Sequence, residues 1–215
     1  MAYDVVIFDL DGTLLDTLDD LMDSCNYALS TIGAPPRTLA EIRRFVGNGI
    51  RNLMLQAVPD GADNPKFEQA YETMQTWYKA HNQIKTAPYP GVQRLIRTLK
   101  QQGVPMAVVS NKPDASVQML VEQWFPEITF GLGEREGLRR KPERDMVDYA
   151  IAQLGQTGKK TVYVGDSEVD LTTAANAGLD CISVTWGFRD RALLVERGAK
   201  QFADTAEELL RLIQG

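Results

Sequence analysis

Short runs of apolar, β-branched residues alternate with helix-like segments along much of this 215-residue chain. Residues 91–102, for example, carry apolar side chains three and four positions apart, as an amphipathic helix does. Strands that alternate with helices form parallel sheets with helices on their faces. The pattern therefore predicts an α/β fold. The expected strands, in order, are residues 4–8, 104–109, 128–130, 161–164 and 181–186.

A long interval separates the first expected strand from the second. It contains three helix-like segments, residues 18–32, 39–58 and 67–84. A crossover between parallel strands does not need about seventy residues, so we interpret the interval as an inserted α-helical domain. We expect residues 1–15 and 87–215 to form the core and residues 16–86 to form a lid-like cap above the strand ends, where α/β sheets bind ligands.

Composition excludes several classes of function. Lys and Arg number 23 against 29 Asp and Glu, a net charge of −6 that repels nucleic acid. No segment has the roughly 18 consecutive apolar residues of a membrane helix, so we expect no membrane association and a cytoplasmic location. Cys25 and Cys181 lie in apolar segments, as reduced and packed thiols do.

Carboxylates follow two of the expected strands. Asp9 and Asp11 come after the first strand in the stretch FDLDGTL, and Asp166 follows the strand at 161–164. Since the carboxyl ends of parallel strands meet at one edge of the sheet, the three should converge with Ser110 and Asn111, which follow another strand. Clustered carboxylates need a cation, and an all-oxygen set favours Mg²⁺.

A basic loop, Arg139-Arg140-Lys141, precedes a helix that we expect to begin near Pro142. A helix amino terminus carries partial positive charge, so Lys141 is expected where an anion binds. For Arg139 and Arg140 we favour the simpler interpretation of a solvated loop.

Taken in order, FDLDGTLLDT, VVSNK, RKP and VGDSEVD resemble the four motifs of the haloacid dehalogenase superfamily, and they extend from Phe8 to Asp170. The insert resembles the helical cap of the phosphoglycolate phosphatase-like branch. The resemblance implies a Rossmann-like parallel-sheet core, a mobile cap and Mg²⁺-dependent phosphoryl transfer. One departure is Arg144, which stands where many members have a second proline.

The resemblance also implies roles for individual residues. Asp9 would be the nucleophile that forms an aspartyl-phosphate, and Asp11 the general acid and then the general base. Mg²⁺ would bind the carboxylates of Asp9 and Asp166 and the main-chain carbonyl of Asp11.

Four further residues of the motifs have implied roles. Ser110, the Asn111 amide and Lys141 would bind the phosphate, and Lys141 would also stabilise charge on Asp9. Asp170 would support the metal site or orient Lys141. Carbon–halogen cleavage is disfavoured, because that branch lacks an acid at the position of Asp11.

Substrate choice is expected to depend on the insert, where two glycines flank Asn48. These glycines allow a tight backbone approach to a ligand, and Arg51 could bind a second anionic group such as a carboxylate, so Asn48, Gly49 and Arg51 are the candidate substrate-binding residues. The alternative is a helix-to-helix turn with a solvated arginine.

These observations predict an Mg²⁺-dependent phosphatase that hydrolyses a small phosphomonoester resembling phosphoglycolate through an aspartyl-phosphate. The alternatives are a phosphomutase of the beta-phosphoglucomutase type, a pyrophosphatase or nucleotidase of the same superfamily, and a non-enzymatic phosphoacceptor module. The expected partner is a small phosphorylated metabolite, and the chain would be a monomer or a homodimer.

Overall fold

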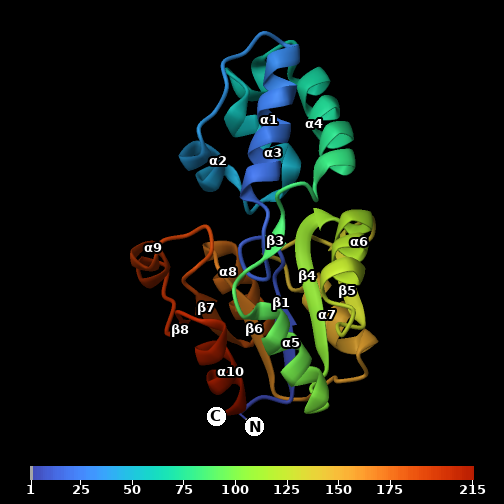
Figure 1. The fold of residues 1–215 in the computed structure, drawn as a ribbon, viewed down its shortest axis with the longest axis vertical. Helices are drawn as coiled ribbons and strands as arrows, with labels where there is room; N and C mark the ends of the chain where they lie inside the picture. Colours follow the sequence, from blue (N-terminus) through green and yellow to red (C-terminus); the bar gives the residue numbers. More distant parts are fainter. Residues whose placement is uncertain (1) are drawn as a thin grey trace. The chain divides into compact units, whose positions relative to one another are not determined.

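Six parallel strands form the main sheet of the computed structural model, which describes residues 2–215 (Figure 1). Their order across the sheet is β5-β4-β1-β6-β7-β8, so β1 lies between β4 and β6. The predicted α/β fold with a parallel sheet is confirmed. The strands are β1 (Val5–Phe8), β4 (Met106–Pro113), β5 (Phe130–Glu134), β6 (Thr161–Gly165), β7 (Asp180–Val184) and β8 (Gln201–Ala203).

Helices cover both faces of this sheet. Alternate residues of β1 belong to two separate apolar clusters, Val6 and Phe8 to one, Val5 and Ile7 to the other, as the two-residue period of a strand requires. The first cluster includes α5 (Val92–Gln101), α6 (Asp114–Trp124) and α10 (Ala206–Gln214), and the second α7 (Asp145–Gln153) and α8 (Glu168–Ala177). The short helix α9 (Arg191–Glu196) follows β7.

The chain divides into two compact units. One comprises the residues up to Leu15 together with Pro88–Gly215, and the other is Asp16–Ala87. The two crossings between the units, β2 (Leu15–Asp16) and β3 (Ala87–Pro88), pair as a two-stranded sheet. The second unit is the predicted helical insert, since it contains α1 (Leu18–Thr31), α2 (Leu39–Phe45), α3 (Gly49–Ala57), a 3₁₀ turn (Gly61–Asp63) and α4 (Phe67–His81).

The segment 39–58, expected as one helix-like stretch, is two helices. Gly47 and Gly49 have φ angles of 125° and 77°, which break the helix between Phe45 and Gly49. Val46 is extended as well, so the chain turns here. Between residues 2 and 215 no helix is both long enough and apolar enough to cross a bilayer.

Three other differences from the predicted elements concern strands. β4 continues to Pro113 instead of ending at Val109, so that Ser110, Asn111 and Lys112 lie within it. β5 begins at Phe130, where the expected strand ended. β8, a three-residue edge strand, was not predicted because Gln201–Ala203 is too short to show a period.

A buried carboxylate ties the two ends of the helical unit together. Asp20, in the first turn of α1, is 2% exposed and accepts hydrogen bonds from the Lys85 and Thr86 amides and from the Thr86 hydroxyl at 2.8–3.1 Å. Asp23, one turn further on, pairs with the Lys85 ammonium at 2.7 Å but is about half exposed. Asp20 therefore fixes the chain at its exit from the insert.

We predict that Asp20→Ala destabilises the protein by roughly 2–4 kcal/mol, because the buried amide and hydroxyl of Thr86 and the partly buried Lys85 amide lose their acceptor. Urea unfolding measures this change, and hydrogen exchange should show faster exchange at Lys85 and Thr86. The matched variant Asp23→Ala removes only an exposed ion pair and should cost less than about 1 kcal/mol. Equal effects of the two substitutions would contradict this assignment.

Candidate active site

The carboxyl ends of three neighbouring strands carry the polar residues that the sequence singled out. Asp9 follows β1, Ser110 and Asn111 lie near the end of β4, and Asp166 follows β6. Because β4, β1 and β6 are adjacent and parallel, these side chains lie at one edge of the sheet. Asp9 and Asp166 are 7% and 1% exposed, so the charges are buried.

The Lys141 ammonium lies at the centre of this cluster. It donates hydrogen bonds to Asp9 Oδ1 at 2.8 Å, to Asp170 Oδ1 at 2.8 Å and to the Tyr163 hydroxyl at 3.0 Å. An ammonium has three protons, so each has an acceptor. Lys141 is itself buried, and its position is fixed by two carboxylates and a phenol.

Asp170 has both oxygens engaged. Oδ1 accepts from Lys141 and lies 3.2 Å from the Tyr163 hydroxyl. Oδ2 accepts from the amides of Asp166 and Ser167 and from the Ser167 hydroxyl, at 2.6–3.2 Å. A Cβ on Gly165 would overlap the Asp170 side chain, so only glycine leaves room for it there. This geometry favours a role for Asp170 in orienting Lys141.

Both carboxylate oxygens of Asp166 also accept hydrogen bonds. Its Oδ2 accepts from the Phe188 amide at 2.7 Å, and its Oδ1 from the Thr13 hydroxyl at 3.3 Å. Gly12, with φ of 85°, and Gly187 press against this carboxylate, and a Cβ at either position would overlap it.

Three carboxylates could hold a metal ion. Asp9, Asp166 and Asp170 can each offer an oxygen within 4.8 Å of the others, and all three are buried. The donors are hard oxygens with no thiolate or imidazole among them, which fits Mg²⁺. Each Asp170 oxygen accepts at least two hydrogen bonds, whereas each Asp166 oxygen accepts one, so Asp9 and Asp166 are the better candidates. The Asp11 carboxylate lies outside this group, so Asp11 could contribute only its main chain.

Burial shifts the ionisation of the cluster. Desolvation raises the pKa of Asp9 to about 7, with Asp170 and Asp11 adding to the shift and Lys141 opposing it. Desolvation and the charges of Asp170 and Asp9 raise the pKa of Asp166 well above its ordinary range. Burial alone would lower the pKa of Lys141, but Asp170 and Asp9 outweigh it and the pKa is raised. Lys141 therefore stays charged.

The Ser110-Asn111-Lys112 stretch of β4 connects the parts of the site. Asn111 Nδ2 donates to the Lys141 carbonyl at 3.0 Å. The Lys112 ammonium pairs with Asp11 Oδ1 at 2.7 Å, and the Lys112 amide donates to the Ser110 hydroxyl at 3.3 Å. The end of β4 thus contacts both the loop that carries Lys141 and the side chain of Asp11.

The expectation that a helix begins near Pro142 is wrong. α7 begins at Asp145, and the Glu143 amide donates to the Arg140 carbonyl at 3.0 Å across a turn that contains a cis Lys141–Pro142 bond. Such turns place a cis proline at their third position. Lys141 is therefore positioned by this turn and by Asn111, and not by a helix amino terminus.

The basic residues beside Lys141 lie at the surface. Arg139 pairs with Asp145 at 2.8 Å and Arg140 with Glu134 at 3.6 Å. Both side chains are exposed, as the solvated-loop interpretation expects.

In the helical unit, Arg51 is engaged with its neighbours. It forms two hydrogen bonds with Glu68, at 3.0 and 2.5 Å, and its guanidinium lies over the rings of Phe67 and Tyr71. Asn48 and Gly49 lie at the start of α3, and the Asn48 side chain makes no capping bond there. A substrate-binding role for Asn48, Gly49 and Arg51 stays a prediction.

Two residues of the cluster were missed from the sequence. Tyr163 sits inside an aliphatic strand and looks like core, although a buried tyrosine hydroxyl usually has a polar partner nearby. Its position three residues before Asp166 was the available signal. Lys112 ends the VVSNK motif, but nothing in the sequence shows that its side chain reaches Asp11.

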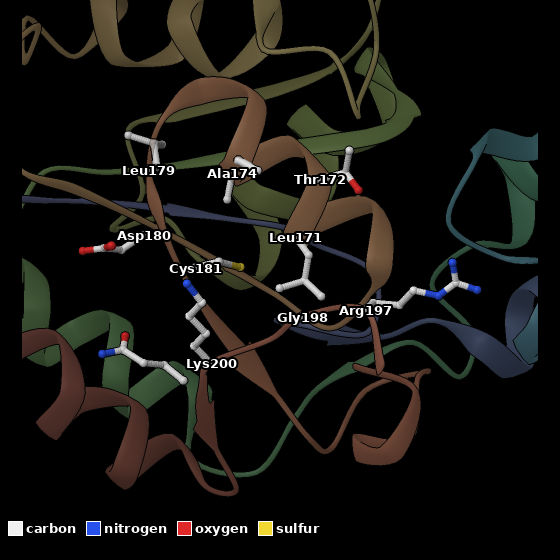
Figure 2. A pocket seen from close by; sticks show the side chains of 11 residues that line it. Leu171, Thr172, Ala174, Leu179, Asp180, Cys181, Arg197, Gly198 and Lys200 are labelled. Carbon is white, nitrogen blue, oxygen red and sulfur yellow. The ribbon is translucent and has the colours of Figure 1, made fainter. Parts of the chain in front are cut away.

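A pocket of about 470 Å³ lies at the other end of the sheet, where β7 and β8 begin (Figure 2). Its lining comes from α8, β7 and the segment before β8, and includes Leu171, Cys181 and Lys200. Burial raises the pKa of the Cys181 thiol. None of the clustered carboxylates lines this pocket, so it is separate from the candidate active site.

A family model described as haloacid dehalogenase-like hydrolase matches residues 6–184, which include every motif residue of the site. The chain belongs to the haloacid dehalogenase-like hydrolase family. The predicted membership is confirmed, and the family match covers the helical insert and the sheet core as far as the end of β7.

Relatives of this hydrolase match along most of its length. A Pseudomonas putida protein named phosphoglycolate phosphatase is 34% identical over 194 residues, 86% of this chain and 70% of that protein. A Pseudomonas fluorescens protein of the same name is 30% identical over 216 residues, 96% and 78% of the two chains. The crystal structure of a provisionally named phosphoglycolate phosphatase from Lactobacillus delbrueckii subsp. bulgaricus has a TM-score of 0.94 and 39% identity, and covers 99% of each chain.

We predict that stability falls between pH 4 and pH 7 when metal is removed with a chelator. The folded pKa of Asp9, about 7, exceeds its ordinary value of 3.8, so over this range the unfolded chain releases a proton that the folded protein keeps. The ionisation of Asp9 therefore makes unfolding easier as the pH rises through this range, by roughly 1 kcal/mol per pH unit, and the effect levels off above pH 7.

Urea unfolding across this pH range tests the expectation. Asp9→Asn should have a shallower slope, while Asp180→Asn, at the amino end of β7, should keep the slope of the unmodified protein. Identical slopes in all three proteins would show that the Asp9 carboxyl does not titrate in this way.

Proposed function

We propose that this hydrolase is an Mg²⁺-dependent phosphatase that acts on a small phosphomonoester resembling phosphoglycolate. The observation that carries the proposal is the buried Asp9 carboxylate, bound by Lys141 at 2.8 Å and grouped with Asp166 at the strand ends. The names of the relatives support the phosphoglycolate-like substrate.

Asp9 is the proposed nucleophile. Lys141 holds Oδ1, so Oδ2 is the oxygen expected to attack. The new bond joins Oδ2 to phosphorus as the ester bond of the substrate breaks, which leaves an aspartyl-phosphate. Lys141 reduces the repulsion between this carboxylate and the incoming phosphate.

Asp11 is the proposed acid and base. It gives a proton to the leaving oxygen in the first step, and in the second it takes one from the water that attacks phosphorus, which releases phosphate and restores Asp9. The Asp11 side chain is 16% exposed, compared with 10% for that of Asp9, so water and a leaving group can reach it. Ser110 and the Asn111 amide would bind the phosphate oxygens.

The metal would be held by the carboxylates of Asp9 and Asp166 and the main-chain carbonyl of Asp11. When bound, Mg²⁺ would supply the positive charge that allows two carboxylates and a phosphate dianion to lie close together. Asp170 and Tyr163 would keep Lys141 in place, and the insert would act as a cap over the strand ends.

We predict metal-dependent release of inorganic phosphate. The panel should include phosphoglycolate, sugar phosphates, nucleoside monophosphates and pyrophosphate, each with Mg²⁺ and with chelator. Preference for a small phosphorylated acid, lost with chelator, is the expected result. Isomerisation of a sugar phosphate without phosphate release would instead identify a mutase, and release that does not depend on metal would contradict the proposal.

We also predict that Asp9→Asn lowers turnover more than about a thousand-fold, because an amide cannot form the phosphoryl bond. Asp180→Asn is the matched control, since it also replaces a carboxylate of the same sheet and should retain turnover. Circular dichroism and cooperative unfolding would show that the inactive protein is folded. Near-normal turnover in Asp9→Asn would rule out the assigned nucleophile.

A further inference from the structure

Lys112 is a buried cation to which the proposed phosphatase chemistry assigns no task. Its side chain is 2% exposed, and its ammonium pairs with Asp11 Oδ1 at 2.7 Å. Burying an ammonium is unfavourable unless an anion compensates it, so its presence beside the proposed acid requires a reason.

The fold is built to place Lys112 there. β4 continues past Val109 with an irregular register to Pro113, and this extension carries Lys112 to the edge of the sheet. Gly133 of β5 packs directly against this extension, and a Cβ there would overlap the Lys112 carbonyl and the Asp114 backbone. The Gly133 amide donates to Asp114 Oδ1 at 2.8 Å and fixes the extension from the other side.

Among residues 2–215, the two other buried cations of the core contact carboxylates other than that of Asp11. The three protons of Lys141 go to Asp9, Asp170 and Tyr163. Arg189 donates two hydrogen bonds to Glu168, at 2.8 and 3.3 Å. Lys112 is the buried cation that contacts Asp11, the residue expected to touch the leaving group.

We infer that Lys112 is a specificity-determining residue that binds a carboxylate on the carbon next to the ester oxygen of the substrate. This inference rests on the proposed function, in which Asp11 hydrogen-bonds that ester oxygen. Lys112 and the ester oxygen then both bind the Asp11 carboxylate, which places them roughly 3–7 Å apart for hydrogen bonds of ordinary length.

That separation selects a class of leaving group. A carboxylate on the adjacent carbon has its oxygens about 3 Å from the ester oxygen, and can therefore reach Lys112 while Asp11 holds the ester oxygen. An ammonium can bridge two carboxylates, since it has three protons. The substrate class is thus a phosphorylated 2-hydroxy acid, of which phosphoglycolate is the smallest. Anionic groups many bonds away from the phosphate would lie beyond Lys112.

The test compares two substrates of nearly equal size. Phosphoglycolate carries the carboxylate, and 2-hydroxyethyl phosphate carries a neutral hydroxymethyl group in its place. Phosphate release gives kcat/KM for both, in the unmodified protein and in Lys112→Met and Lys112→Gln. The glutamine variant keeps a donor for Asp11 and provides a second protein if the methionine variant fails to fold.

We expect both variants to lose roughly 10- to 100-fold in kcat/KM for phosphoglycolate, the effect of one charge-assisted hydrogen bond, and much less for 2-hydroxyethyl phosphate. The ratio of the two values is the decisive readout, because a merely structural role would lower both together. Lys100→Met, an exposed lysine in the last turn of α5, is the matched control and should keep the ratio.

The inference would be overturned if the Lys112 variants kept the ratio of the two kcat/KM values, whether both values fell equally or neither fell. The inference would also be overturned if Arg51→Met, and neither Lys112 variant, lowered the ratio of kcat/KM for phosphoglycolate to kcat/KM for 2-hydroxyethyl phosphate. That result would place carboxylate recognition in the helical unit. If the unmodified protein hydrolyses small phosphomonoesters with Mg²⁺ but does not prefer those with a carboxylate next to the ester carbon, the inference fails while the metal-dependent phosphatase activity of the proposed function stands. If it hydrolyses no phosphoester, the proposed function itself fails.

Discussion

The hydrogen bonds of Lys141 are the interaction on which the arrangement of the site depends. Four carboxylates, those of Asp9, Asp11, Asp166 and Asp170, lie at or near the carboxyl ends of β1 and β6, and Lys141 contacts two of them directly. Without this ammonium, the buried carboxylates would face one another at an unfavourable cost. With it, Asp9 and Asp170 have fixed orientations, and the remaining negative charge around Asp9 and Asp166 suits a divalent cation.

Close backbone packing makes these contacts possible. Gly12 and Gly187 admit the Asp166 carboxylate, and Gly165 admits Asp170, where any side chain would overlap them. The Asn111 side-chain amide donates a hydrogen bond to the Lys141 carbonyl, and the Lys112 ammonium forms an ion pair with Asp11. Because each of these partners is itself buried or hydrogen-bonded, the acidic groups are held before a ligand binds, as preorganised electrostatic catalysis requires.

Much of this could be predicted from the sequence, because it depends on chain order. Alternating strands and helices predict a parallel sheet, and carboxylates that follow β1 and β6 must then meet at one edge. The separation of the helical insert followed from the length of the interval between β1 and β4. These features need only periodicity and spacing, which a single sequence displays.

The remaining features depend on packing between distant residues. A helix starting at Pro142 was a reasonable local expectation, but the turn at Arg140–Glu143 and the Asn111 contact override it. The break at Gly47 separates α2 from α3, although apolar spacing continues through it. Likewise, the contact of Tyr163 with Lys141 joins β6 to a loop 22 positions away, and no local pattern reveals it.

The central claim is that Asp9 carries the phosphoryl group during turnover. Peptide mass spectrometry of protein quenched in acid while it hydrolyses phosphoglycolate with Mg²⁺ tests this most directly. We expect the peptide containing Asp9 to gain the mass of one phosphoryl group, and to lose it once the substrate is exhausted. Rapid turnover with no labelled peptide, or with the label on another residue, would contradict the account.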